Sequence, residues 1–343
     1  MSVEGHQPPE PESRRPHWVS RVAFFVVVGT FFLSEAALFA AVHAHWYWLA
    51  VPLVVLTSHL MHGQLIGFHE ASHGLLRRNR ILNEIDGVLI GTFSFMSFSL
   101  YRASHQTHHL HLGTTRDEEF WPLTDPAVPR WGRALAAFLE LNFGLLYSPF
   151  IFLRTFLREN TPIRSRKVRR RIWSELALIV VAWSCLLLAV HQFNGWRYFI
   201  WMYLAPAILA GNLQSWRKYI EHVGMTGTTV RGITRSIVAD GPVGRLIALT
   251  LLHEPYHGVH HQRAGVRHWE LPQLASDLTP GRAGERPPFE SYGRALADLL
   301  FSLKNPRLGA EWCDRENDFL PRARCDEPSA QESRGSLVSG HVR

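Results

Sequence analysis

The chain has 343 residues, of which 46% are hydrophobic, and its formal net charge is +7. The apolar residues are gathered into long runs instead of being spread at amphipathic spacing, which favours an all-α integral membrane protein over a pair of soluble domains. The basic residues flank these runs rather than covering one soluble domain, so nucleic-acid binding is disfavoured. Three widely spaced cysteines predict neither a disulfide framework nor a thiolate metal site.

The first 17 residues are polar and rich in Pro and Glu, and we expect them to form a disordered cytoplasmic arm. The apolar run that follows is too long and starts too late for a cleavable signal peptide. Four runs are long enough to cross a bilayer as helices. The predicted spans cover residues 22–42, 46–68, 172–193 and 197–216.

The loops between these spans predict the topology. Short, nearly uncharged turns join the first span to the second and the third to the fourth, whereas arginines follow the second span and precede the third. Because cytoplasmic loops carry an excess of Lys and Arg, the long inner segments and both termini are expected in the cytoplasm. We therefore expect a multi-pass protein of the bacterial inner membrane, with its active site on the cytoplasmic side.

Two further apolar segments are expected not to cross the membrane. Residues 85–100 are too few for a span and contain glycines and hydroxyl side chains, which predicts a re-entrant or interfacial helix. Residues 134–157 are long enough, but they include Glu140, Asn142 and Pro149 and are expected at the interface. Basic residues between Arg154 and Arg171 either attract anionic lipid head groups or dock an acidic redox partner.

We expect residues 18–320 to form one membrane domain, in which the segment after the fourth span is a cytoplasmic helical cap. The tail at 321–343 is polar and is expected to be disordered.

Three histidine motifs punctuate this domain. The first is His69-Glu70-Ala71-Ser72-His73, in which the two histidines lie one helical turn apart on one face. The second and third have the form His-x-x-His-His, which places three imidazoles on one side of a helix. They consist of His105, His108 and His109, and of His257, His260 and His261.

The number of histidines predicts the kind of metal centre. One zinc ion needs three or four ligands, and the three motifs supply eight, which fits a centre of two metal ions with nitrogen ligands. His222 lies just beyond the inner end of the fourth predicted span and is a candidate for the ninth ligand. Taken alone, the first motif also matches zinc peptidases, with Glu70 as general base, but that interpretation leaves most of these histidines unexplained.

Other polar residues have subsidiary roles in this prediction. His62, His111 and His253 are weaker candidates for ligands. Four acids are expected to orient the ligand imidazoles through hydrogen bonds. They are Glu70, Asp117, Glu118 and Glu221.

The three motifs, in this order around four spans, resemble the membrane fatty acid desaturase and hydroxylase superfamily. The segment Tyr219-Ile220-Glu221-His222-Val223-Gly224 is also similar to a ligand-bearing segment of membrane alkane monooxygenases. The resemblance implies two iron ions, O2 as co-substrate, a lipid or acyl substrate and a separate electron donor. It also implies nine iron ligands: His69, His73, His105, His108, His109, His222, His257, His260 and His261.

Sequence motifs for an internal electron carrier are absent. There is no Gly-x-Gly-x-x-Gly segment and no cysteine cluster, so electrons are expected from another protein, of the ferredoxin or rubredoxin type that the resemblance implies. Three functions remain open: an acyl desaturase, which we prefer; a hydroxylase of an alkane, acyl chain or carotenoid; and an intramembrane zinc peptidase or other non-oxidative metal protein.

Overall fold

The structure is a computed structural model in which residues 18–282 and 284–312 are described; the predicted arm at 1–17 and tail at 321–343 lie outside this part. Its described elements are helical, apart from one isolated β-bridge between Ile237 and Phe289. The long helices are α1 (Trp18–His43), α2 (Tyr47–Ser72), α3 (Arg80–Phe93), α4 (Phe98–His111), α5 (Arg130–Leu157), α6 (Arg166–Gln192) and α8 (Ala205–His222). The short elements are α7 (Trp196–Tyr198), η1 (Phe199–Leu204), α9 (Val230–Ile233), α10 (Pro242–Thr250), α11 (His257–Gln262), η2 (His268–Leu278), α12 (Tyr292–Ser302) and η3 (Ala310–Trp312).

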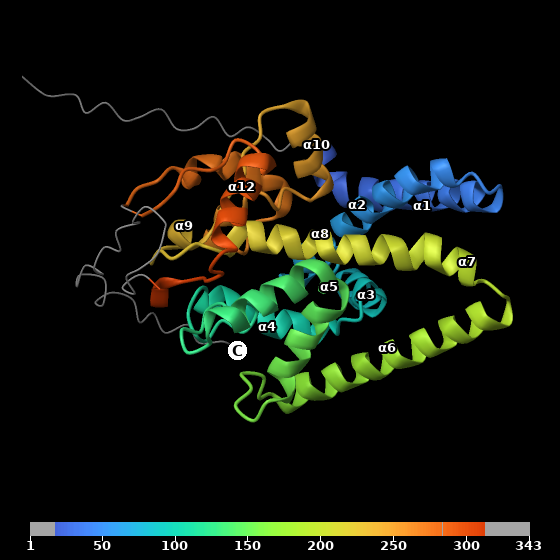
Figure 1. Ribbon diagram of the computed structural model, residues 1–343, viewed down its shortest axis with the longest axis horizontal. Helices are drawn as coiled ribbons and strands as arrows, with labels where there is room; N and C mark the ends of the chain where they lie inside the picture. The colour runs from blue at the N-terminus through green and yellow to red at the C-terminus, as the bar shows by residue number, and fades with distance from the viewer. Residues whose placement is uncertain (1–17, 283, 313–343) are drawn as a thin grey trace, which may run out of the picture.

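Four helices are long and apolar enough to cross a bilayer, namely α1, α2, α5 and α6. Three of them, α1, α2 and α6, coincide with predicted spans. In Figure 1 these three helices and α8 extend toward the same end of the molecule, and α1 packs on α2, which packs on α8.

Helix α5 is the fourth of these apolar helices, although we expected it at the interface. Its backbone is non-helical at Phe143, where two helical pieces meet at a kink. Each piece is roughly 20 Å long at 1.5 Å per residue, which is less than the ~30 Å of a hydrocarbon core. By length and composition α5 could cross a bilayer. Because of the kink, however, neither of its two straight pieces is long enough to cross alone.

The predicted fourth span is helical throughout but irregular. It is divided into α7, the π-helix η1 and α8, so no single regular helix covers residues 197–216. π-Helical turns are rare and occur mostly within longer helices, often near functional sites. Here η1 precedes the helix that ends at His222.

The segment at 85–100, predicted as re-entrant or interfacial, covers most of α3 and the start of α4, a bent pair whose axes differ by 100°. Asn79 caps α3 by accepting hydrogen bonds from Ile81 N and Leu82 N, and Ser97 caps α4 by accepting one from Leu100 N. Side-chain acceptors satisfy the free N–H groups at a helix start, which explains why two helices begin here instead of one continuing. The bend returns the second histidine motif to the end of α2.

A buried carboxylate holds this bend against α6. Glu175 accepts hydrogen bonds from Ser97 Oγ at 2.7 Å, Ser99 N at 2.8 Å and Ser99 Oγ at 2.7 Å. Further along α6, Trp183 Nε1 donates a hydrogen bond to Thr92 O at 2.9 Å. The α3–α4 pair is therefore fixed from α2 on one side and from α6 on the other.

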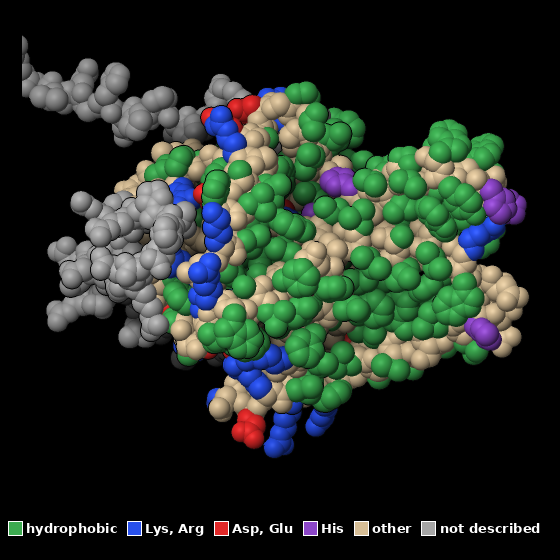
Figure 2. All heavy atoms as spheres, viewed as in Figure 1, with side chains coloured by type: hydrophobic (Ala, Val, Ile, Leu, Met, Phe, Trp, Pro, Cys, Tyr) green, Lys and Arg blue, Asp and Glu red, His purple; other side chains and the backbone are tan. Residues whose placement is uncertain are grey.

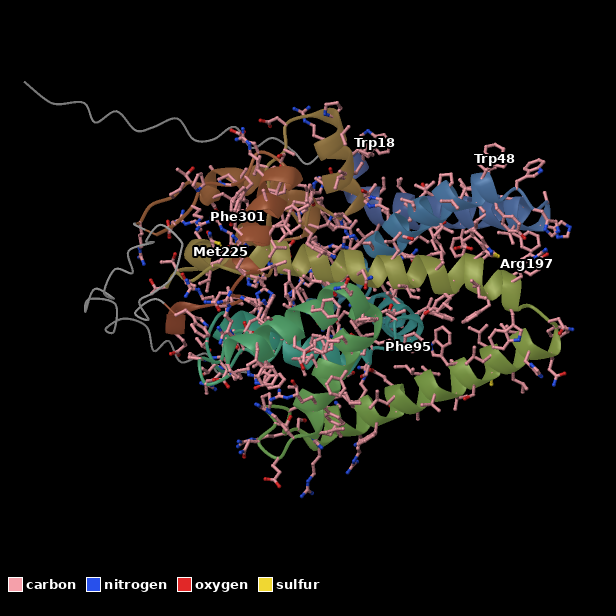
Figure 3. The ribbon with its side chains drawn as sticks, viewed as in Figure 1. Trp18, Trp48, Phe95, Arg197, Met225 and Phe301 are labelled. Carbon is pink, nitrogen blue, oxygen red and sulfur yellow. The ribbon has the colours of Figure 1, made fainter. Side chains whose placement is uncertain are left out.

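Large apolar side chains cover the outside of the long helices. Phe32 is 65% exposed, Leu33 72%, Val180 65% and Leu188 59%. Soluble proteins rarely expose so large a patch of apolar side chains to water. Figure 2 shows this apolar surface as a continuous green region, with Lys and Arg gathered beside it. Trp18 and Trp48 lie toward opposite ends of the α1–α2 hairpin in Figure 3, as residues of two membrane–water interfaces would.

The helices α9 to α12 gather around the C-terminal end of α8 (Figure 1). Tyr219, Val223 and Met225 at this end share a buried cluster with Ile233 and Leu299. The fully buried Arg235 donates to the carbonyl of Ile220 and pairs with Asp298 on α12. These contacts position the end of α8 and the third histidine motif.

Helices α5 and α8 approach closely at two glycines, and we predict that Gly211→Val disturbs this contact. A Cβ at Gly211 would lie 2.8 Å from Leu145 N and 2.9 Å from Leu145 Cα, so backbone must move. We expect a loss of about 1–3 kcal/mol, measured as a lower midpoint of thermal unfolding in detergent. Gly29→Val on α1 is the control, because a Cβ there meets no atom within 4 Å; equal losses in both variants would contradict the prediction.

Candidate metal centre

Four segments that are distant in sequence bring the three histidine motifs and His222 together. His69 lies in the last turn of α2, and His73 follows its end. The second motif lies on α4, His222 is the last residue of α8, and the third motif forms α11. Because each segment ends at or passes through the same buried space, all nine predicted histidines meet there.

The nine histidines form two adjacent sets. In the first set, one nitrogen from each of five imidazoles lies within 4.8 Å of the others, an arrangement that could hold a metal ion; its members are His69, His73, His105, His109 and His260. A second set with the same property consists of His108, His222 and His261. His257 adjoins this second set, with its Nε2 2.7 Å from His222 Nε2 and 3.0 Å from His261 Nε2.

The two sets touch one another. The rings of His109 and His261 stack with centroids 4.3 Å apart, and His108 lies between His105 and His222 at centroid distances of 5.5 and 5.1 Å. Two metal ions bound by the two sets would therefore be close neighbours.

Acceptors behind the rings fix the tautomer of several imidazoles. His105 Nδ1 lies 2.9 Å from Glu119 Oε2, His108 Nδ1 lies 2.9 Å from Asp117 Oδ2, and His222 Nδ1 lies 3.2 Å from Ile233 O. A carboxylate or carbonyl at Nδ1 holds the proton there and leaves the Nε2 lone pair free. That lone pair faces the other histidines, as a metal ligand requires.

Burial keeps imidazoles of the centre neutral. It lowers the pKa of His73 to about 3 and that of His257 to about 4. At His108 burial also acts to lower the pKa, but Asp117 and Glu119 outweigh it and raise the pKa above its usual value. Among the described residues, neither ring nitrogen of His69 or His260 has a hydrogen-bond partner. Neutral, converging and partly unpaired nitrogens are suited to bind divalent metal ions.

Glu254 connects the two sets. Its Oε1 lies 3.0 Å from His257 Nδ1 and 2.9 Å from Arg217 Nη1, and its Oε2 lies 3.3 Å from His69 Nδ1. Burial alone would raise the pKa of this carboxyl, but His69, Arg217 and the hydrogen bond from His257 together hold it well below its usual range. Glu254 is therefore an ionised carboxylate that accepts a hydrogen bond from His257 and lies within ion-pair distance of His69.

The four acids predicted to orient ligand imidazoles differ in where their carboxylates lie. Asp117 has the expected hydrogen bond to His108, and Glu221 lies 3.5 Å from His257 Nδ1 while pairing with Arg217. Glu70 lies 3.9 Å from His69 Nδ1, beyond hydrogen-bond distance. The prediction for Glu118 is wrong: its carboxylate pairs with Arg154 and Arg158 on α5 and the following turn.

Sequence reasoning missed Glu119 and Glu254. Glu119 is the last of three successive acids, and no periodicity in that turn shows which of them face the histidines. Glu254 stands three residues before His257, a spacing that could have indicated it.

The three weaker histidine candidates lie outside both sets, as far as the described residues show. His253 is buried in the turn between α10 and α11, with φ of 56°, and its ring is 6.2 Å from that of His268. His62 is buried on α2, and His111 is half-buried at the end of α4.

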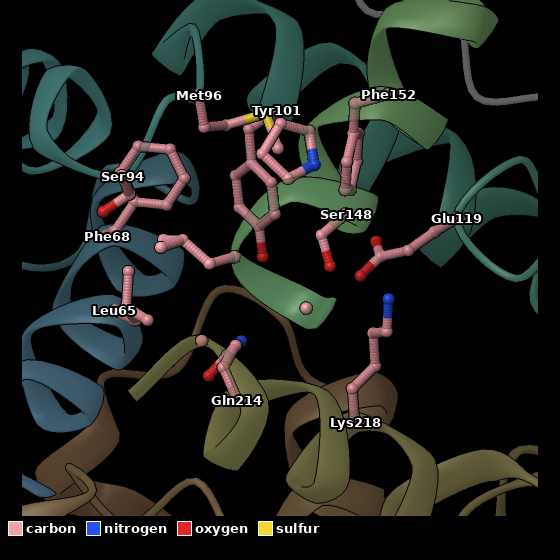
Figure 4. Close-up of a pocket in the computed structure, with 14 residues that line it drawn as sticks. Leu65, Phe68, Ser94, Met96, Tyr101, Glu119, Ser148, Phe152, Gln214 and Lys218 are labelled. Atoms are coloured by element: carbon pink, nitrogen blue, oxygen red, sulfur yellow. The ribbon is translucent and has the colours of Figure 1, made fainter. Parts of the chain in front are cut away.

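A mostly apolar cavity lies between α2, α4, α5 and α8 (Figure 4), and two residues of its wall, Tyr101 and Glu119, contact His105. Leu65, Phe68, Met96 and Phe152 form much of its wall. Tyr101 also lines it, and the Tyr101 ring stacks on His105 with centroids 5.2 Å apart and an interplanar angle of 8°. A chain of methylene groups in this cavity would therefore be separated from His105 by the side chains of Tyr101 and Glu119.

Apolar spans around a buried centre of histidines define a class of membrane metalloprotein. Residues 46–293 match the fatty acid desaturase family, which is most of the chain. The protein belongs to that family.

Individual relatives are distant. A fatty acid desaturase of Bacillus subtilis (strain 168) is 24% identical over 267 residues, 72% of each chain. An sn-1 acyl-lipid omega-3 desaturase (ferredoxin) of Nostoc sp. (strain 36) is 22% identical over 254 residues, 68% of each chain. The chloroplastic sn-2 acyl-lipid omega-3 desaturase (ferredoxin) of Helianthus annuus is 34% identical over 116 residues, which is 32% of this chain and 26% of that one.

We predict that Asp117→Asn lowers metal affinity by about 10- to 100-fold, because an amide cannot replace the carboxylate that accepts the His108 proton. Metal retained per chain after dialysis against graded chelator concentrations measures the effect. The matched control is the adjacent Glu118→Gln, whose carboxylate faces arginines instead of histidines. Equal retention in both variants and the unmodified protein would contradict the prediction.

Proposed function

We propose that the protein is a membrane-bound desaturase that uses O2 and external electrons to introduce a double bond into a fatty acyl chain. The observation that carries this proposal is the pair of adjacent imidazole sets, next to an apolar cavity whose wall residues Tyr101 and Glu119 contact His105. The nine histidines would hold two iron ions: His69, His73, His105, His109 and His260 one of them, and His108, His222, His257 and His261 the other. Bound iron would supply the reduction of O2 and the removal of hydrogen from an unactivated C–H bond.

Residues of the chain itself orient the ligands and bind the substrate. Asp117, Glu119 and Glu254 keep the Nδ1 protons in place and orient the imidazoles. Phe68, Met96 and Phe152 exclude water and align a hydrocarbon chain along the cavity. Burial of the centre keeps solvent protons away from the reacting carbon atoms.

A hydroxylase of the same superfamily is the second candidate. The same metal ligands serve both reactions, and the position of the bound chain decides whether a second hydrogen or an oxygen atom is transferred. The relatives named as acyl-lipid desaturases support desaturation and an acyl chain as the substrate.

A zinc peptidase is the least favoured candidate. It would need one metal ion and the first motif alone, which leaves the set around His108, His222 and His261 without a role.

The proposed setting is the bacterial inner membrane, with the centre and both termini in the cytoplasm. Two observations support this orientation. Arginines cluster at the start of α6 and after α2, and an apolar surface separates these arginines from the turns at the other end of the long helices (Figure 2). The electron donor would then be a soluble cytoplasmic protein of the ferredoxin or rubredoxin type, and two relatives carry "ferredoxin" in their names.

We predict that a bacterial host expressing the protein with a ferredoxin system accumulates fatty acids that are two hydrogen atoms lighter, and that His109→Ala abolishes this product. His109 belongs to the first set and stacks on His261 of the second, so its loss disturbs both. Mass spectrometry of total lipids and iron analysis of the purified protein test the prediction together.

The control for this experiment is His191→Ala, because His191 is exposed at the end of α6 away from the centre. A product one oxygen atom heavier would identify a hydroxylase instead. One zinc ion per chain, with activity surviving in His260→Ala, would overturn the proposal in favour of the peptidase.

We also predict that the triple change Arg166→Gln, Lys167→Gln, Arg170→Gln raises the KM for an acidic donor several-fold, while kcat at saturating donor changes little. These three side chains are exposed. Arg169 is left unchanged, because it donates to the carbonyls of Phe156 and Ile163 within the protein. The steady-state rate is measured against donor concentration at low and high salt. An unchanged KM at low salt would assign these residues to lipid head groups alone.

A further inference from the structure

The cavity wall contains one hydroxyl that faces the open space of the cavity. It belongs to Tyr101, which lines the cavity and is only 8% exposed as a whole residue. In Figure 4 this hydroxyl points toward the middle of the cavity, between Ser148 and Gln214 on one side and Phe68 on the other. A hydroxyl that faces the cavity can donate a hydrogen bond to an oxygen atom of a bound ligand, which would favour a ligand that carries such an atom.

Packing fixes the direction of this hydroxyl. The Tyr101 ring lies against Phe68 and Phe152, with centroids 4.7 and 5.3 Å away, so it cannot swing out to solvent. Its face covers His105 in a nearly parallel stack, and the O–H group lies in the plane of the ring. The hydroxyl therefore does not point at the His105 ring but along the cavity.

The other polar groups of the wall already have partners. Glu140 Oε1 accepts from Ser148 Oγ at 2.5 Å, Lys218 Nζ at 2.8 Å and Ser215 Oγ at 2.9 Å. Glu119, which also lines the cavity, contacts His105. Two carboxylates beside one ammonium group give this end of the cavity a negative charge, which disfavours an anionic ligand.

We propose that Tyr101 is a positioning residue that donates a hydrogen bond to a neutral oxygen of the lipid, such as a hydroxyl or an ester carbonyl. The preferred substrate would then be a chain with a neutral oxygen function, held by that oxygen one helical turn from His105. The carbon atoms beside this oxygen would then lie close to Tyr101, whose ring covers His105. Selection by the oxygen is a property of binding, whereas oxidation of those carbons rests on the proposed function.

Binding to the purified full-length protein tests the proposal. Native mass spectrometry measures the occupancy of hexadecane, hexadecanol, methyl hexadecanoate and hexadecanoate at matched concentrations. We expect hexadecanol or the methyl ester to bind about three- to tenfold more tightly than the alkane, as one net hydrogen bond allows. The comparison of these two probes identifies a hydroxyl or a carbonyl as the acceptor.

Tyr101→Phe removes the hydroxyl and keeps the ring. We expect it to abolish the preference for the oxygenated chain and to leave binding of hexadecane unchanged. The control is Tyr198→Phe, since Tyr198 Oη lies at the far end of the long helices, 2.9 Å from His43 Nδ1. In turnover, we expect Tyr101→Phe to raise KM for the oxygenated chain with kcat retained.

Several results would overturn the proposal. These are equal binding of alkane and alcohol to the unmodified protein, tightest binding of hexadecanoate, or a preference that survives in Tyr101→Phe. A fall in kcat for every substrate, with the preference intact, would place the hydroxyl at the metal centre instead. The binding preference without any O2-dependent product would support the role of Tyr101 and refute the desaturase.

Discussion

The structure depends on the convergence of nine imidazoles in one buried space. Their lone pairs face each other at nitrogen–nitrogen distances near 3 Å, as between His73 and His105 or His222 and His257. Such an arrangement is stable when cations lie between the rings, because each lone pair then has a partner. The ends of α2 and α8, the whole of α4 and the short α11 are placed so that this convergence is possible. A metal ion bound there would join residues from four segments, of which α2 already packs on α8 and on α4.

Carboxylates make this convergence possible at ordinary pH. Imidazoles that were protonated would repel one another, and burial together with acceptors at Nδ1 keeps the protons on the outer side of the rings. Two of these acids, Glu221 and Glu254, share the buried Arg217. The site is thus a layered structure in which histidines are inside, acids surround them and an arginine neutralises part of the acidic layer.

The sequence alone predicts the parts of this architecture that repeat with a helical period or that are long. The histidines of each motif share a helix face, so their convergence follows from spacing, and α1, α2 and α6 follow from their apolar length. The α5 kink could not be predicted, because Phe143 is an ordinary helix residue and the bend arises where Gly144 meets Gly211 of α8. The choice among Asp117, Glu118 and Glu119 could not be made either, since these acids lie in an irregular turn whose direction depends on tertiary contacts.

Glu254 has a consequence for how the centre would be filled. One carboxylate oxygen of Glu254 bonds to His257, and the other lies 3.3 Å from His69 Nδ1, so a movement of this side chain affects both sets. A metal ion that orders Glu254 by binding to the first set would also prepare the second, and by thermodynamic reciprocity the second would strengthen the first by the same factor. The two positions would then load as a cooperative pair, and singly occupied protein would be scarce even when metal is limiting.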